Sequence, residues 1–406
     1  MIRLSDLPIP QRRAIDLVKE VATDKDCRPF LVGGPVRDLL LGRHAIDVDV
    51  TLEEGASTLA RALAKRVEGR VRSFPQFLTY KVTAEGLPEI DIATARKERY
   101  RKPGALPLVT AGRLRDDLMR RDFSVNAVAF GLLDEKLHDP TGGARDISDR
   151  LIRVLHDQSF LDDPTRVLRA IRLATRLGFT TEPQTARLMR EAIDSGALGT
   201  VSRERVWREL FLAMDEQDAP AVLAALRDEG ALDVLFGRRA TSDLREKLDA
   251  VREQIERNPE LDRYVLYTGL LLRGDASPVD FEGSGFSQKR VRAVVEIANE
   301  LPRFHDALEH AASDQQRFRL YRSVSPEMLS VIAAERPAET QKIARWREFE
   351  RFTLPLRGND LEVPGGPHIA KALERTREAV FSGEIPPEQA RSYAKEMAKR
   401  YLESEV

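Results

Sequence analysis

The sequence predicts an α+β fold in which a mixed α/β segment is followed by helices alone. Short apolar runs typical of strands alternate with helical stretches before about residue 155, and none follows it. Long amphipathic stretches occupy the remainder of the chain. Because 406 residues exceed what one ordinary hydrophobic core organises, we expect two to four domains.

Five apolar runs in the first third predict strands, and one stretch between them predicts a helix. The helix covers residues 54–67, where Leu59, Leu63 and Val67 recur at helical spacing. The predicted strands are residues 29–32, 46–50, 70–74, 77–84 and 89–93. The later predicted helices are residues 163–177, 182–194, 202–213, 219–228, 241–256 and 287–300. Glycine and proline punctuation indicates breaks near residues 235 and 340.

The amino-acid composition limits which binding partners and which cellular compartment we expect for the protein. The 65 basic and 66 acidic residues give a net charge of -1, so a polyanion would be held by local basic patches and not by a global field. The single cysteine, Cys27, excludes an intramolecular disulfide and a cysteine-rich metal site. Neither a membrane-spanning apolar run nor a signal-peptide stretch occurs, so we expect a cytoplasmic protein without a membrane partner.

A predicted strand runs directly into a glycine pair and a helix at residues 30–42. Gly33 and Gly34 would let a triphosphate approach the backbone, and the N–H groups of the helix would face it. Arg37, one turn further on, would add a charge-assisted contact. The pattern lacks the fuller spacing of a P-loop or dinucleotide motif, so taken alone it fits an ordinary strand-to-helix turn equally well.

Two carboxylates follow on the next predicted strand. Asp47 and Asp49 project from one face of it, where paired like charges cost stability unless a cation lies between them. Oxygen ligands without a nearby His or Cys indicate Mg²⁺. A third carboxylate, Asp91, lies between apolar residues on the strand 89–93. The alternative is an exposed edge strand that alternates charge with valine.

These features together match the arrangement used in two-metal nucleotidyl transfer. One Mg²⁺ ion would lower the pKa of an attacking 3′-hydroxyl, and a second would bind the triphosphate oxygens and the departing pyrophosphate. We therefore expect Asp47, Asp49 and Asp91 to be catalytic, with Asp47 and Asp49 as the metal ligands. No general base is then required.

Four motifs occur in order within residues 28–180. They are Leu31–Gly42 with Asp47–Asp49, Asp117–Ala127, Asp139–Asp146 and Asp163–Ala170. With these motifs the chain resembles the class II tRNA nucleotidyltransferases, which comprise the CCA-adding enzymes and their bacterial poly(A) polymerase relatives. The similarity is weaker at Ser202–Arg205 and Gly358–Leu361.

The resemblance implies both an organisation and a reaction. It implies a polymerase-β-like nucleotidyltransferase head at residues 1–155, followed by a helical neck, body and tail at residues 156–235, 236–340 and 341–406. It also implies Mg²⁺ dependence and the addition of C and A residues from CTP and ATP to the 3′ end of tRNA. The expected RNA contact is the tRNA 3′ end and acceptor arm, and nothing indicates a protein partner. Whether CCA, CC or A alone is added stays open.

The resemblance further implies nucleotide-binding residues beyond the glycine turn. In the family, the motif Arg120-Arg121-Asp122 contacts the ribose and phosphates of the incoming nucleotide. Asn126, four residues after Asp122, would brace the same loop or the ribose. Alone, this motif would fit a solvated basic helix end. Arg169, in the last of the four motifs, completes the implied set.

Asp163 and Arg166 are expected on one helix face as an edge that reads the base. A carboxylate accepts from an exocyclic amine and a guanidinium donates to a ring nitrogen, which suits cytosine and adenine but not guanine or uracil. Discrimination on the order of 10⁴-fold would follow. The alternative is a surface salt bridge. Asp162 stands where the family usually has Glu, which shortens the reach of that carboxylate.

A basic stretch at residues 96–102, followed by Pro103 and Gly104, predicts a mobile loop beside the site. In the resembling family, a flexible loop here helps to convert the pocket from C addition to A addition. Two further basic clusters, residues 287–292 and 317–322, are candidates for RNA binding. Solvated helix faces explain both clusters as well.

Three other functions remain as alternatives. A poly(A) polymerase typically shows a basic pair after the second strand, where this chain reads Ser73–Phe77 instead. A catalytically silent RNA-binding protein of the same fold would have no reason to keep three mutually repelling carboxylates. Nucleotidyl transfer to a small molecule would leave the long helical part without a task.

Overall fold

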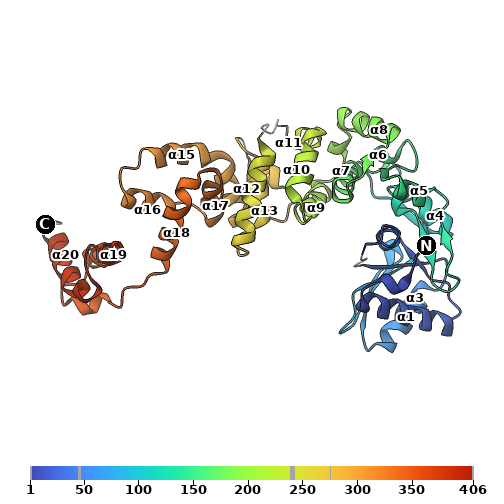
Figure 1. Ribbon diagram of the computed structural model, residues 1–406, viewed down its shortest axis with the longest axis horizontal. Coiled ribbons are helices and arrows are strands. Elements are labelled where there is room, and N and C mark those ends of the chain that lie inside the picture. The colour runs from blue at the N-terminus through green and yellow to red at the C-terminus, as the bar shows by residue number, and fades with distance from the viewer. Residues whose placement is uncertain (1, 44–46, 238–242, 275, 405–406) are drawn as a thin grey trace. The chain divides into compact units, whose positions relative to one another are not determined.

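The computed structural model describes residues 2–43, 47–237, 243–274 and 276–404 and confirms the α+β class (Figure 1). The chain divides into two compact units. The first comprises residues 1–246 and 277–288, and the second comprises residues 247–276 and 289–406. Within the described ranges, no helix combines the length and the apolar character needed to cross a membrane.

The first unit begins with a mixed sheet. Seven strands of the described residues form it in the order β3-β4-β5-β2-β1-β8-β9, and only β2 and β5 run parallel as neighbours. Their bounds are β1 Phe30–Val32, β2 Val48–Leu52, β3 Arg70–Phe74, β4 Thr79–Thr83, β5 Ile90–Thr94, β8 Ala129–Gly131 and β9 Leu137–His138. All five predicted strands are confirmed, with small shifts at their ends. The first residue of the predicted strand 46–50 lies outside the described residues.

Two helices, α1 (Ile9–Asp24) and α3 (Ala56–Arg66), lie side by side against the sheet (Figure 1). α3 confirms the predicted helix 54–67 and buries Leu59 and Leu63, each of which contributes about 1.5–3 kcal/mol to folding. The apolar residues of β2 and β5 that alternate with the carboxylates are also buried. Because successive strand side chains point to opposite faces, Asp49 and Asp91 lie on the face away from this core.

Short helices and turns complete the sheet region. The helices are α2 Gly34–Leu40, α4 Leu114–Met119 and α5 Gly143–Ser148, and 3₁₀ turns occur at Leu4–Asp6, Pro75–Phe77 and Ser124–Asn126. The motif Asp139–Asp146 contains a turn at Gly142, which has φ 75°. Asp139 fixes it, because its Oδ1 accepts from the Gly143 N–H at 2.7 Å and its Oδ2 from the Ala144 N–H at 2.9 Å.

The predicted loop at residues 96–102 is in part a β-hairpin. β6 (Arg96–Arg99) pairs antiparallel with β7 (Leu108–Ala111), so residues 96–99 form a strand where a mobile loop was expected, and the mobility of the segment stays a prediction. The cations of the stretch do not all face solvent: the Arg96 side chain lies 3.1 Å from the nearly buried carboxylate of Glu98. The stretch is therefore not exposed to solvent along its whole length.

Helices follow the sheet within the first unit. They are α6 Ser159–Asp162, α7 Thr165–Leu177, α8 Pro183–Asp194, α9 Arg203–Met214, α10 Ala219–Asp228 and α11 Ala231–Phe236, with 3₁₀ turns at Ala197–Thr200 and Pro278–Phe281. The predicted helices of this stretch are confirmed. One expectation fails: β10 (Leu151–Ile152) pairs with β11 (Thr180–Thr181) beyond residue 155. A strand of two residues is too short to leave a periodic pattern in the sequence.

The described residues of the second unit are helical. The helices are α12 Leu244–Arg257, α13 Arg263–Leu271, α14 Gln288–Val295, α15 Leu301–Glu309, α16 Asp314–Arg322, α17 Pro326–Glu335, α18 Pro337–Arg351, α19 Pro367–Ser382 and α20 Ala390–Ser404, with a π-helical turn at Glu296–Glu300 and 3₁₀ turns at Gly358–Leu361 and Pro387–Gln389. The predicted helix 241–256 begins outside the described residues. α18 runs through the predicted break near residue 340, and the four-domain division stays a prediction.

Candidate active site

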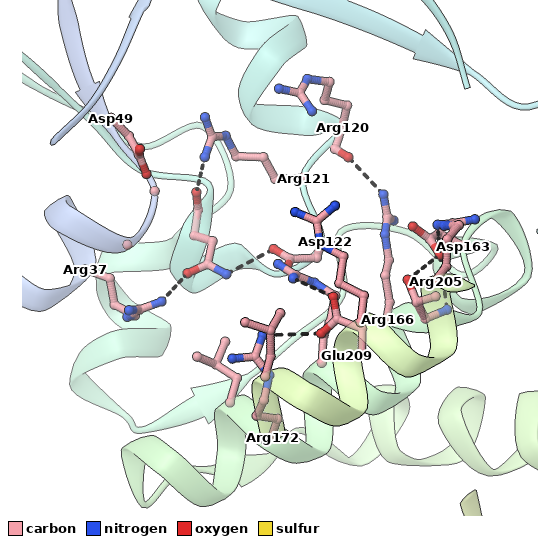
Figure 2. Close-up of a pocket in the computed structure, with 18 of the residues that line it drawn as sticks. Arg37, Asp49, Arg120, Arg121, Asp122, Asp163, Arg166, Arg172, Arg205 and Glu209 are labelled. Atoms are coloured by element: carbon pink, nitrogen blue, oxygen red, sulfur yellow. Dashed lines mark hydrogen bonds and ion pairs between the residues drawn. The ribbon is translucent and has the colours of Figure 1, made fainter. Parts of the chain in front are cut away.

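A cavity of about 690 Å³ lies in the first unit between the sheet and helices α7 and α9. Figure 2 shows Asp49 and Arg37 at one side of it and Asp163, Arg166 and Arg205 at the other. Of the predicted site residues, all except Asp91 line the cavity. They are Gly33, Gly34, Arg37, Asp47, Asp49, Arg120, Arg121, Asp122, Asn126, Asp163, Arg166 and Arg169.

The glycine turn has a conformation and a neighbour that exclude a side chain. Gly33 has φ 73°, in the left-handed region, and a Cβ there would lie 2.8 Å from Nη1 of Arg121. α2 begins at the next residue, as predicted. Arg37, in α2, is buried at 4% exposure, and burial lowers the pKa of its guanidinium. Its Nη1 donates to Asn126 Oδ1 at 2.6 Å, so Arg37 is already bonded within the protein.

The predicted carboxylates lie together at the edge of the cavity. Asp49 on β2 is the register partner of Asp91 on β5. Burial, followed by the charges of Asp91 and Asp47, raises the pKa of Asp49 to about 6. Burial also raises the pKa of Asp91, although Lys81 Nζ lies 3.3 Å from its Oδ2. The side chains therefore repel one another, as expected from the sequence.

The residues at this edge fit Mg²⁺. Asp91 Oδ1 is buried and has no hydrogen-bond partner, which leaves an oxygen that suits a hard cation or a donor group. No group of three or more His, Cys, Asp or Glu side chains in the described part of the chain could hold a metal together. The protein would thus contribute the two predicted ligands, Asp47 and Asp49. Mg²⁺ is commonly bound by one or two carboxylates together with water and substrate phosphates.

A buried carboxylate that the sequence did not single out holds the two arginines of the second motif. Asp117 is fully buried at the end of α4, and its Oδ1 accepts from Arg120 Nη2 at 2.7 Å. Its Oδ2 accepts from Arg121 Nη2 at 3.0 Å. Burial opposes ionisation, but the two guanidinium groups lower the pKa of Asp117. Arg120 and Arg121 are therefore anchored by a common acid and are not a solvated helix end.

A chain of polar contacts connects the motif to the helices beyond it. Asn126 Nδ2 donates to Asp122 Oδ1 at 3.0 Å, a contact within the loop, and its expected role toward the nucleotide stays a prediction. Arg169 Nη2 on α7 donates to Asp122 Oδ2 at 2.6 Å, and its Nη1 lies 3.3 Å from Glu209 Oε1 on α9. Burial opposes ionisation of Asp122, but Arg169 and Asn126 keep its pKa far below the usual value. Figure 2 shows Asp122 and Glu209 between the two sides of the cavity.

Arg169 was expected to bind nucleotide, but in the structure its guanidinium contacts Asp122 and Glu209. Its pKa is raised, chiefly by Asp122, because both acidic partners stabilise the charged form. Although Arg169 lines the cavity, these contacts join the motif to α7 and α9. Its expected role in binding nucleotide stays a prediction.

The predicted base-reading pair lies at the start of α7. Asp163 was expected on the helix. It instead precedes α7 in extended conformation, because α7 begins at Thr165. Asp163 Oδ1 accepts from the Thr165 hydroxyl at 2.6 Å and lies 2.7 Å from Arg205 Nη2. Arg166 is buried at 5% exposure, and its Nη1 and Nη2 donate to Ser159 Oγ at 2.7 Å and to the Arg120 carbonyl at 3.0 Å. Both side chains are held in place.

Several cavity residues were missed in the sequence. They are Arg96, Glu98, Tyr100, Thr165, Arg172, Leu173, Arg176, Arg205, Arg208, Glu209 and Leu212. The weaker motif Ser202–Arg205 pointed to α9, but nothing showed that this helix faces the sheet region. Arg205 also donates to the Gly104 carbonyl at 3.1 Å, so it joins Asp163 to the tip of the β6–β7 hairpin.

The two basic clusters of the later chain are paired with acids in part. In the first, Arg290 lies 2.6 Å from Asp262. In the second, Arg317 lies 2.9 Å from Glu339 and Arg322 lies 2.9 Å from Glu374. These pairs reduce the positive charge that the clusters present to RNA, and their proposed contact with RNA stays a prediction.

The cavity has the composition of a site for a nucleoside polyphosphate. Carboxylates that suit Mg²⁺ stand at one end, beside a glycine turn that admits close approach to the backbone. Arginines line the wall, and a held Asp and Arg stand at the other end. The fold and the site together thus define a nucleotide-binding head followed by helices.

Comparisons with known proteins agree with this class. Residues 29–153 match the family model described as "Poly A polymerase head domain", and residues 178–241 match "Probable RNA and SrmB- binding site of polymerase A". An A-adding tRNA nucleotidyltransferase of Aquifex aeolicus is 33% identical over 87% of this chain and 45% of its own length. One from Halalkalibacterium halodurans is 34% identical over 84% of this chain and 81% of its own length.

A solved structure shows the same likeness. The CCA-adding enzyme of Thermotoga maritima complexed with tRNA is 25% identical, with a TM-score of 0.78 over 97% of this chain and 95% of that one. The present chain belongs to the family of class II tRNA nucleotidyltransferases and bacterial poly(A) polymerases. It spans about half the length of the Aquifex relative, at 45%.

Proposed function

We propose that the chain is a template-independent RNA nucleotidyltransferase that adds C and/or A residues to the 3′ end of tRNA. Of these residues, the terminal A is the one we expect it to add. The observation that carries the proposal is the pairing of Asp49 with Asp91 at the edge of a cavity that also contains the Gly33 turn and an arginine wall. Charge and backbone access are thus matched to a triphosphate at the point where a hydroxyl would attack.

The reaction is attack of the RNA 3′-oxygen on the α-phosphorus, which forms a phosphodiester and releases pyrophosphate. Mg²⁺ held by Asp47 and Asp49, in one or two ions, would supply charge that lowers the pKa of the 3′-hydroxyl and stabilises the leaving group. Gly33 admits the triphosphate to the backbone, and Arg121, 2.8 Å from the position of a Gly33 Cβ, supplies positive charge next to it. Asp91 contributes the third carboxylate.

Asp163 and Arg166 would select the base. All three described contacts of the Asp163 side chain, two from Thr165 and one from Arg205, use Oδ1, so its Oδ2 is available to accept from an exocyclic amine. Arg166 uses Nη1 and Nη2 within the protein, and its position is thereby fixed before the nucleotide arrives. A fixed acceptor beside a fixed donor matches cytosine and adenine, while guanine and uracil would leave buried polar groups unpaired.

Addition of A is favoured over the full CCA sequence by two observations. The A-adding relatives are similar over more than four fifths of this chain, at 87% and 84%. In addition, the stretch that a C-to-A switch would use is a paired hairpin whose Gly104 N–H lies 3.3 Å from the carbonyls of Leu161 and Asp162. A segment held in this way is less suited to reshape the pocket between two bases.

The test supplies the purified protein with tRNAs that end at the discriminator base, at C and at CC, each with one labelled triphosphate at a time. Incorporation of a single A onto the tRNA ending in CC, and of nothing onto the other two, is the expected result. Ordered addition of C, C and A would show a CCA-adding enzyme. A long homopolymer of A on any RNA would show a poly(A) polymerase, and absence of incorporation with every substrate would contradict the proposal.

A further inference from the structure

A row of charged side chains crosses the sheet beside the proposed catalytic carboxylates. Asp49 on β2 is opposite Asp91 on β5, Asp91 is opposite Lys81 on β4, and Lys81 is opposite Arg72 on β3. Side chains at directly opposed positions lie on the same face of a sheet. The row therefore reads acid, acid, base, base, and Lys81 is the first cation after the carboxylates.

Lys81 contacts one oxygen of Asp91 only. Its Nζ lies 3.3 Å from Asp91 Oδ2 and also pairs with Glu89. The other oxygen, Oδ1, is buried and has no hydrogen-bond partner. A buried carboxylate oxygen without a donor is unfavourable in a structure, so a bound cation or donor group would stabilise Asp91 Oδ1.

The ion pair of Lys81 with Asp91 contributes little to the stability of the fold. Its effect on the orientation of the Asp91 carboxylate is therefore more important. The Lys81 side chain is 33% exposed and that of Asp91 is 36% exposed, and ion pairs of this exposure are weak. The direction of the contact matters more, because Asp91 faces the like charge of Asp49 across the parallel strands. Without a cation on its far side, the Asp91 carboxylate would be free to turn away from Asp49.

We propose that Lys81 is a positioning residue that holds Asp91 by Oδ2 and so keeps the Asp91 carboxylate beside Asp49. This inference rests on the proposed function, in which Asp91 is the third carboxylate of nucleotidyl transfer. Lys81 touches neither the nucleotide nor the RNA 3′ end and acts through Asp91 alone. A sequence-based reading could not find it, because the residue is recognised only from the order and register of β4, β5 and β2.

The first part of the test compares turnover with binding in single variants. Lys81→Met is expected to lower kcat for A addition by about 10- to 100-fold, since small misplacements of reacting groups have effects of this order. The KM for ATP and the Kd for tRNA are expected to change less than about twofold, because Lys81 contacts neither ligand. Lys81→Arg is expected to restore most of kcat, since it can still donate to Oδ2.

Arg72→Met is the matched control, because Arg72 is the next cation of the same row and does not line the cavity. It removes the same charge from the same face and is expected to leave kcat unchanged. The affinity for Mg²⁺ with an ATP analogue whose α–β bridging oxygen is replaced by methylene gives a readout without turnover. That affinity is expected to stay within about threefold of wild type in Lys81→Met, since Lys81 holds neither the ion nor the nucleotide.

The second part asks whether Lys81 acts through Asp91. In an Asp91→Asn background, Lys81→Met is expected to have almost no further effect on kcat, because residues that act as a unit are not additive. Equal losses in both backgrounds would overturn the inference, as would a Lys81→Met protein with wild-type kcat or a Lys81→Met loss matched by Arg72→Met. A wild-type protein that incorporates no nucleotide would overturn the proposed function itself, and with it this inference.

Discussion

Asp122 and Arg169 form a contact of 2.6 Å between the loop after α4 and helix α7. Asp122 is almost fully buried and also accepts from its neighbour, the Phe123 N–H, at 2.8 Å. Arg169 continues the contact to Glu209 on α9. The pair therefore joins the loop after α4 to α7, which carries Arg166, and to α9.

Removing one member of this pair is expected to destabilise the first unit strongly. Asp122→Ala would leave the partly exposed Arg169 guanidinium with only Glu209 and would remove the acceptor of Asn126, and losing hydrogen bonds to a charged group costs about 1.5–3 kcal/mol. Denaturant titration followed by far-UV circular dichroism measures the change. The control is Asp149→Ala, whose pair with Arg145 is exposed and contributes less than about 1 kcal/mol. Equal losses in the two variants would contradict a structural role for the Asp122 pair.

Asp49→Ala is expected to abolish nucleotide incorporation while leaving the affinity for tRNA within about twofold of wild type. Asp49 lies at the Mg²⁺ end of the cavity, and its effect would be on chemistry and not on the contacts that hold RNA phosphates. Incorporation of labelled ATP and filter binding of tRNA measure the two quantities. Retained turnover in this variant would remove Asp49 from the metal-binding assignment.

Arg166→Lys is expected to relax the choice of base more than it weakens tRNA binding. Lysine keeps the charge but loses the planar pair of donors, and misincorporation of UTP and GTP relative to ATP should rise by about 10- to 100-fold. Ser159→Ala is the matched control, because it removes one anchor of the guanidinium and leaves the guanidinium itself. If the Arg166→Lys variant still excluded UTP and GTP, the proposal that Arg166 selects the base would be wrong.

The sequence predicted the strands and helices well because their hydrophobic periodicity is local. It also placed twelve of the site residues that line the cavity, because the motifs lie close to the strand ends and helix starts that meet there. The hairpin at residues 96–111 was misread, because five cations in seven positions suggested solvent and hid the pairing of Arg96 with Glu98. Local charge patterns do not reveal which acid will neutralise them.

The contacts between distant segments could not be predicted from the sequence. Lys81 and Asp91 meet only because β4 lies beside β5, and Arg169 reaches Asp122 only because α7 packs near the end of α4. Asp117 and Glu209 were missed for the same reason, since each is one acid among many until its partners are known. The register of one strand pair, β2 with β5, places Asp49 opposite Asp91, whereas Asp47, which was expected on the strand, precedes β2.

The raised pKa of Asp49 leads to a prediction for stability against pH. Its pKa is about 6 in the folded protein and close to 3.8 when unfolded, so the folded state binds the proton more tightly. Between these values the folded state therefore loses stability as the pH rises, and above about pH 6 the full cost of an ionised Asp49 is present. Asp49→Asn removes this cost and should stabilise the metal-free protein at pH 8.

The expected gain in the free energy of unfolding is about 1–2 kcal/mol after allowance for solvent screening. It should disappear near pH 4, where residue 49 of the folded protein is neutral in both wild type and variant. Thermal unfolding in the presence of a chelator, at pH 8 and at pH 4, measures the difference between wild type and variant. Added Mg²⁺ should reverse the order at pH 8, because an ion that binds the folded state stabilises wild type more than a variant lacking a ligand. If Asp49→Asn were less stable than wild type at pH 8 without Mg²⁺, ionised Asp49 would not destabilise the folded protein, and the prediction would be wrong.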